Sequence, residues 1–237
     1  ANKNNNNNLD TNMPFGVPEC DYVPSLRMFR VRKVIGKQFF AGGFGMTLLS
    51  NKDEGGDSSS SKNNRQSSEY LFLEEALFLS ERGVLQVYSE QGELLHLQRL
   101  YEMLETTRVP ISIYLTYAHL RRQDYRVLRH VPDASMTKDS KEARRTVVLT
   151  TLNEDASSIA FDVYPPNTHF KRTDPGIPHL QVAVASFQLP SLTFFELQTL
   201  SQKSGTVPLK IATVSDSGVV VMFAVTSNVG VVPTIHI

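Results

Sequence analysis

The longest uninterrupted apolar run in this chain is Val219–Val225, seven residues without a polar side chain. A membrane-spanning helix needs about 20 apolar residues, so this run is too short to cross a bilayer. A strand with one face in solvent alternates apolar and polar residues, and this run does not alternate. We therefore expect a strand that is covered on both faces, either by its own domain or by another chain.

Charged side chains are scarce around that run. Residues 156–237 carry four basic and four acidic groups, whereas the whole chain of 237 residues carries 24 of each. The balanced charge gives no overall field that would draw the protein to nucleic acid or to a membrane, and we expect no membrane partner. A segment so poor in charge predicts a C-terminal domain that pairs with a partner chain.

Polar stretches rich in Asn, Ser and Gly divide the chain. Such stretches offer little to bury, so they are typical of flexible segments. We predict a disordered tail at 1–22, an N-terminal module at 23–130 with a flexible insertion at 50–69, a linker at 131–155 and a C-terminal domain at 156–237. The single cysteine, Cys20, cannot form an internal disulfide, which favours a reducing compartment.

Apolar spacing predicts helices at 74–82, 94–105 and 111–123, with strands at 84–88 and 125–130. The order helix, strand, helix, helix, strand is typical of a winged-helix-like α/β module. Further on, strands at 158–164, 179–187, 208–214 and 219–225 and a helix at 194–203 predict a mixed β-sheet domain. The last two strands are expected to form a hairpin around Asp216. The fold class is therefore predicted as α/β, of the α+β kind.

No cofactor or metal is expected. The histidines have no ligand-like spacing with Cys20 or with one another, which argues against a metal site. The glycine clusters lack the spacing of a phosphate-binding loop, which argues against a nucleotide cofactor.

A basic stretch occupies the end of the third predicted helix and the strand after it; its members are Arg121, Arg122, Arg126 and Arg129. Arginines beside tyrosines suit phosphate contact and base stacking in RNA. Cations at a helix end also complement the helix dipole, so a solvated helix end remains an equal alternative. Lys37 belongs to a second basic cluster, which spans 27–37.

Four segments, in order along the chain, resemble a known family. They are GKQF with GF at 36–44, EEALFLSERG at 74–83, YAHLRRQDYRVLR at 117–129 and SGTVPLKIA at 204–212. Together they resemble the structural, non-catalytic subunit of tRNA-splicing endonuclease, the fifty-four type. Phe39 stands where that family has tryptophan, and Asp124 stands where it has glycine. The linker is also shorter than is common in the family.

The resemblance implies a C-terminal domain with the fold of tRNA-intron endonucleases. It also implies a nuclear subunit, with an organelle surface as the alternative location, in a heterotetramer with catalytic and structural sister subunits. The four arginines and Lys37 would then contact precursor tRNA. A partner subunit would meet the last hairpin, at Asp216, Val219, Val221 and Phe223.

The family reaction is metal-independent attack of a ribose 2′-hydroxyl, which leaves a 2′,3′-cyclic phosphate. It needs a base, an acid and a cation. The resemblance places Tyr164 and His179 at the acid and base positions, but Val207 at the lysine position. We therefore expect both to be relics and the chain not to be an enzyme by itself. The alternatives are a catalytic subunit that uses Lys210 or another cation, and an interaction module unrelated to RNA.

Overall fold

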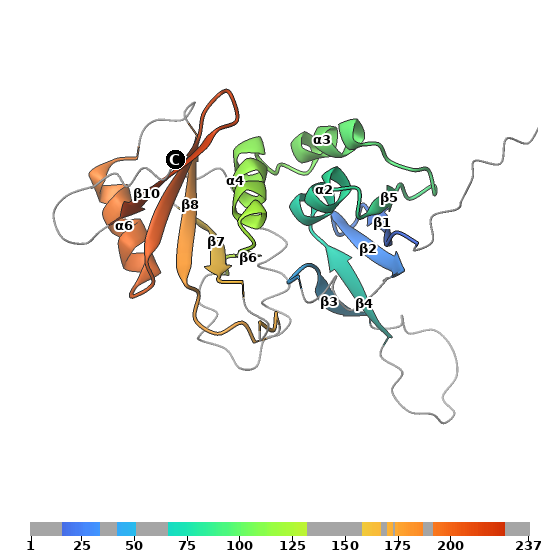
Figure 1. Ribbon diagram of the computed structural model, residues 1–237, viewed down its shortest axis with the longest axis horizontal. Coiled ribbons are helices and arrows are strands. Elements are labelled where there is room, and N and C mark those ends of the chain that lie inside the picture. Colours follow the sequence, from blue (N-terminus) through green and yellow to red (C-terminus); the bar gives the residue numbers. More distant parts are fainter. Residues whose placement is uncertain are drawn as a thin grey trace, which may run out of the picture.

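The computed structural model describes residues 16–33, 42–50, 66–131, 158–166, 170–172, 174–186 and 192–225. These residues form an α+β fold with two mixed five-stranded sheets (Figure 1), which confirms the predicted class. Most of the predicted tail, insertion and linker lies outside the described residues, as does Lys37. In the described part, no helix is long and apolar enough to cross a membrane.

Sheet 1 contains β1 to β5, in the order β3-β4-β2-β1-β5. Its strands are β1 (Glu19–Val23), β2 (Met28–Lys33), β3 (Met46–Ser50), β4 (Gln66–Leu71) and β5 (Gln86–Tyr88). Two predicted flexible segments are wrong at their ends, because β1 begins inside 1–22 and β4 begins inside 50–69. Pairing with β2 and β3 satisfies the backbone groups of these polar strands.

Three helices follow in the predicted order, with β5 between the first two. They are α2 (Leu73–Glu81), α3 (Leu97–Thr106) and α4 (Ile111–Arg122). Helical spacing over 94–105 predicts a buried stripe of Leu94, Leu97, Tyr101 and Leu104, but the first three of these are exposed and only Leu104 is buried. The helix begins at Leu97, and it buries Leu100 and Met103 beside Leu104.

Sheet 2 contains β6 to β10, in the order β10-β9-β8-β7-β6. Its strands are β6 (Arg126–Arg129), β7 (Ile159–Tyr164), β8 (Leu180–Ser186), β9 (Leu209–Val214) and β10 (Val220–Val225). Helix α6 (Phe194–Ser204) connects the parallel strands β8 and β9. The four predicted C-terminal strands, the helix and the hairpin are confirmed. Strand β6, expected in the N-terminal module, pairs with β7 and so belongs to sheet 2.

Strand β10 lies between two helices, α4 on one side of sheet 2 and α6 on the other (Figure 1). Val220 and Met222 pack against the large core that contains α4, and Val225 packs against the small core under α6. All six residues of β10 are half-buried. Helices of this same chain therefore cover part of both faces of this strand.

One large core joins the two sheets through α2 and α4. Four aromatic rings follow one another across it, from Phe44 to Phe78, Tyr117 and Phe161. Their centroids are 6.2, 6.0 and 6.0 Å apart in that order. Phe161 belongs to β7 and Phe44 precedes β3, so this chain of rings connects sheet 2 with the edge of sheet 1.

Candidate functional site

Two neighbouring glutamates at the start of α2 are almost fully buried. Glu74 is 1% exposed and Glu75 is 2% exposed. Their position in the first helical turn favours negative charge, because the backbone N–H groups there are unpaired. The Glu75 carboxylate accepts a hydrogen bond from one such group, the Phe72 N–H, at 2.9 Å. A buried carboxylate still needs a cation or several donors, so each glutamate requires a partner from elsewhere in the chain.

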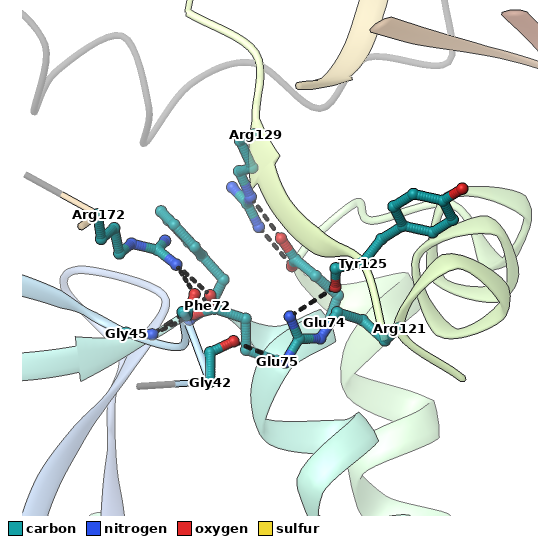
Figure 2. A network of polar contacts seen from close by, with 10 residues as sticks. Gly42, Gly45, Phe72, Glu74, Glu75, Arg121, Tyr125, Arg129 and Arg172 are labelled. Carbon is teal, nitrogen blue, oxygen red and sulfur yellow. Dashed lines mark hydrogen bonds and ion pairs between the residues drawn. The ribbon is translucent and has the colours of Figure 1, made fainter. Parts of the chain in front are cut away.

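Glu74 is paired with Arg129 of β6. The guanidinium donates two hydrogen bonds of 2.6 Å, one to each carboxylate oxygen (Figure 2). It also lies 3.8 Å from the centre of the Phe72 ring. This bidentate pair ties the first turn of α2 to the edge strand of sheet 2.

Glu75 is paired with Arg172, which follows β7. The Arg172 guanidinium donates to Glu75 Oε1 at 2.8 Å and to the Gly43 carbonyl at 2.6 Å (Figure 2). The Gly45 N–H also lies 3.3 Å from both oxygens of Glu75. Gly43 has a φ of +76°, and a Cβ there would lie 3.0 Å from the Phe170 ring. Both the backbone conformation and the close ring therefore require glycine.

Arg121 is a third internal arginine and is only 7% exposed. It donates to the carbonyls of Tyr125 and Gly42, both at 2.9 Å (Figure 2). Its guanidinium lies 3.9 Å from the centre of the Phe44 ring, and burial lowers its pKa. Together, Glu74, Glu75, Arg121, Arg129 and Arg172 form a network that we call the inter-sheet network.

The four arginines predicted to bind RNA thus differ in their surroundings. Arg121 and Arg129 are bonded inside the protein, which argues against direct phosphate contact by these two. Arg122 is 59% exposed, with its Nη2 3.4 Å from Glu81 Oε2. Arg126 is half-buried and donates to the Asp124 carbonyl at 3.3 Å. RNA contact by Arg122 and Arg126 stays a prediction.

Sequence reasoning missed three members of the inter-sheet network, Glu74, Glu75 and Arg172. Arg172 lies in a polar stretch and has no spacing pattern that links it to α2. The available signal was the glutamate pair itself, because two adjacent acids in an apolar helix need two cations once they are buried.

Tyr164 and His179 lie at neighbouring strand ends. Tyr164 ends β7 and is buried, with its hydroxyl 3.5 Å from the Gly176 carbonyl. Burial, with a smaller contribution from Asp162, raises its pKa. His179 is exposed, and its backbone N–H donates to the Val163 carbonyl at 2.9 Å. No hydrogen bond joins the two side chains in the part of the chain that the structure describes.

The lysine position of the resemblance lies just before β9. Val207 is half-buried there, and its carbonyl accepts a hydrogen bond from the Ser204 hydroxyl. Lys210 lies further along, inside β9, opposite Val182 and Ala224 of the neighbouring strands. A relic role for Tyr164 and His179 stays a prediction.

A second polar group, which sequence reasoning also missed, lies on sheet 2. Asp162 of β7 is 3.0 Å from the His130 Nδ1 and accepts from the Gln181 amide at 2.9 Å. The register of β7 and β8 places Asp162 and Gln181 directly opposite each other. Over the described ranges, no group of three or more histidine, cysteine or acidic residues could hold a metal ion.

The residues predicted to meet a partner lie around the last hairpin. Asp216 and Val219 are exposed in the turn between β9 and β10, and Val221 and Phe223 are half-buried in β10. Among the strands that the structure describes, β10 pairs with β9 alone and forms an edge of sheet 2. A partner at this edge stays a prediction.

Residues 17–89, which include all five strands of sheet 1 and helix α2, match the family described as tRNA-splicing endonuclease subunit sen54 N-term. A stretch of 60 residues is 40% identical to the probable tRNA-splicing endonuclease subunit sen54 of Schizosaccharomyces pombe. That stretch covers 25% of this chain and 16% of the yeast protein, so the alignment spans about a sixth of its relative. These matches confirm the resemblance: residues 17–89 of this chain are similar to the N-terminal part of tRNA-splicing endonuclease subunit sen54.

Proposed function

We propose that this chain is a non-catalytic, structural subunit of a tRNA-splicing endonuclease and helps to position precursor tRNA for intron removal. The observation that carries the proposal is the family match over residues 17–89. The inter-sheet network supports a structural role, because it joins that matched module to sheet 2 by buried ion pairs.

The missing cation supports a non-catalytic role. Val207 has no charge to stabilise the phosphate in the transition state. One such contact contributes about 10²–10³ in rate. Tyr164 is also buried, in hydrogen-bond range of a backbone carbonyl and beside the Phe170 ring at 5.3 Å, a setting that suits a packing residue.

The partners we propose are catalytic and structural sister subunits in a heterotetramer, together with precursor tRNA, in the nucleus. The edge strand β10 and the exposed hairpin offer backbone groups and apolar side chains to a sister subunit. Arg122 and Arg126 remain the candidates of the predicted basic stretch for contact with the tRNA.

Co-purification of the tagged chain from its native cells tests this proposal. We expect sister subunits of the endonuclease and intron-containing tRNA to be recovered with it, identified by mass spectrometry and by RNA sequencing. The matched control is a tagged Val221→Lys, Phe223→Lys variant, because two charges on the edge strand would oppose pairing with a sister subunit. Recovery of the wild-type chain as a monomer without tRNA would contradict the proposal.

A further inference from the structure

Sheet 1 has one buried face and one face turned away from the core. Residues that alternate along its strands pack under α2, and each is at most 1% exposed; they are Cys20, Phe29, Leu71 and Val87. Successive side chains of a strand point to opposite faces. Asp21, Arg30, Tyr70 and Tyr88, each next to one of these four, therefore share the other face, which we call the outer face.

The strand register places four side chains of the outer face in one row. Tyr88 of β5 is opposite Asp21 of β1, and Asp21 is opposite Arg30 of β2. Arg30 is in turn opposite Tyr70 of β4. Arg32 lies two residues after Arg30 and so shares this face. Two arginines are thus placed between two tyrosines on four neighbouring strands.

Asp21 fixes both arginines in place. Arg32 donates one hydrogen bond to its carboxylate, through Nε at 2.5 Å, and its Nη2 makes an ion-pair contact with the other carboxylate oxygen; Arg30 Nη2 lies 3.6 Å from the same carboxylate. The Arg32 guanidinium also lies 5.0 Å from the centre of the Tyr88 ring. The side chains of Arg30 and Arg32 are still 52% and 42% exposed. Their remaining N–H groups are therefore oriented in advance and open to solvent.

A hollow of about 540 Å³ lies at the end of this face, next to the turn between β1 and β2. It is lined by Arg30, Arg32, Tyr22, Pro24, Ser25 and Glu90, among others. Its volume is within the range of ligand sites. The guanidinium fork matches a phosphate with two parallel hydrogen bonds.

We propose that the outer face of sheet 1 binds the sugar–phosphate backbone of RNA, with Arg30 and Arg32 on the phosphates and Tyr70 and Tyr88 beside the riboses or bases. Arginines interleaved with aromatic rings are the combination that binds RNA, because cations neutralise phosphates and rings stack on bases. This inference rests on the proposed function, since the RNA would be the precursor tRNA.

The test is binding of intron-containing tRNA by the assembled complex over a series of salt concentrations. For the Arg30→Ala, Arg32→Ala double variant we expect binding to be weakened by about a hundredfold or more, because two charge-assisted contacts are lost. The slope of log K against log salt should fall by about 0.7–0.9 for each lost phosphate contact. Arg99→Ala is the matched control, since Arg99 is 64% exposed on α3 and forms an ion pair with Glu102 of the same helix.

Ultraviolet crosslinking of the tRNA to the protein is a second, independent measurement. We expect crosslinks from the tRNA to peptides that contain Tyr70 or Tyr88, and crosslinks elsewhere alone would overturn the inference. Should the double variant fail to assemble, Arg30→Gln alone serves instead, because Asp21 then keeps its bonds to Arg32. For that single variant, the slope of log K against log salt should fall by the amount of one phosphate contact.

The outcomes separate this inference from the proposed function. If the wild-type complex binds the tRNA and the double variant binds equally well with the same slope, the RNA-binding face is wrong and the proposed function stands. If the variant loses a sister subunit but keeps its tRNA affinity, the face binds protein and the inference is also wrong. If the wild-type complex does not bind the tRNA, the proposed function itself fails.

Discussion

Replacing Arg129 with alanine is expected to lower the free energy of unfolding by about 3–5 kcal/mol. The substitution would leave the Glu74 carboxylate, which is 1% exposed, without its bidentate partner. The contact of the guanidinium with the Phe72 ring would be lost as well. Urea denaturation followed by circular dichroism measures this loss.

A double substitution separates the ion pair from simple packing. When both partners of a buried pair become apolar, stability is often unchanged or improved. Glu74→Met with Arg129→Met should therefore cost less than Arg129→Ala alone. The exposed pair of Arg99 and Glu102 supplies the control, and Arg99→Ala should cost less than about 1 kcal/mol. A cost below about 1 kcal/mol for Arg129→Ala would mean that this pair does not hold β6 against α2.

Replacing Phe161 with alanine is expected to cost about 3–5 kcal/mol of stability. Phe161 is fully buried, at 0% exposure, and its ring lies 6.0 Å from that of Tyr117 on α4. The cavity would open where the large core passes from α4 into sheet 2. Urea denaturation of the variant and the wild-type chain measures the difference.

Phe194→Ala is the matched control, because Phe194 is 82% exposed at the start of α6. It should change the stability by no more than about 0.5 kcal/mol. Because one core joins the two sheets, Phe161→Ala should shift a single unfolding transition rather than split it. Separate transitions for the two sheets would show that the core does not make them one cooperative unit.

Sheet 2 could be predicted because its strands are rich in apolar and β-branched residues. Val220–Val225 is apolar throughout, and turn residues separate it from Leu209–Val214. Both faces of such strands are buried, so their composition differs clearly from that of a loop. The helices could also be predicted from the sequence, because their apolar residues recur at helical spacing.

Sheet 1 could not be predicted in the same way, since one of its faces is polar. Strand β4 reads QSSEYL, which resembles the polar insertion before it. What makes it a strand is pairing with Met46–Ser50 on one side and with β2 on the other. Backbone pairing of this kind depends on tertiary context rather than on local composition.

The roles of the arginines could not be separated from sequence either. Arg121 and Arg122 are neighbours of identical type, yet the rotation of α4 buries the first and exposes the second. Successive helix positions are about 100° apart around the helix axis, so two neighbouring side chains point in different directions and only one of them enters the core. The partner of Glu75, Arg172, is 97 positions away and is brought close only by the fold.

The measurement that tests the non-catalytic role most directly is single-turnover cleavage of intron-containing tRNA by the purified assembly that carries Tyr164→Phe and His179→Ala. We expect both splice sites to be cut at the wild-type rate, with the same subunits present by size-exclusion chromatography. If these two groups were the acid and base of one cut, cleavage at that site would fall by about 10²–10⁴-fold. Such a loss at one site, in an intact assembly, would contradict a purely structural role.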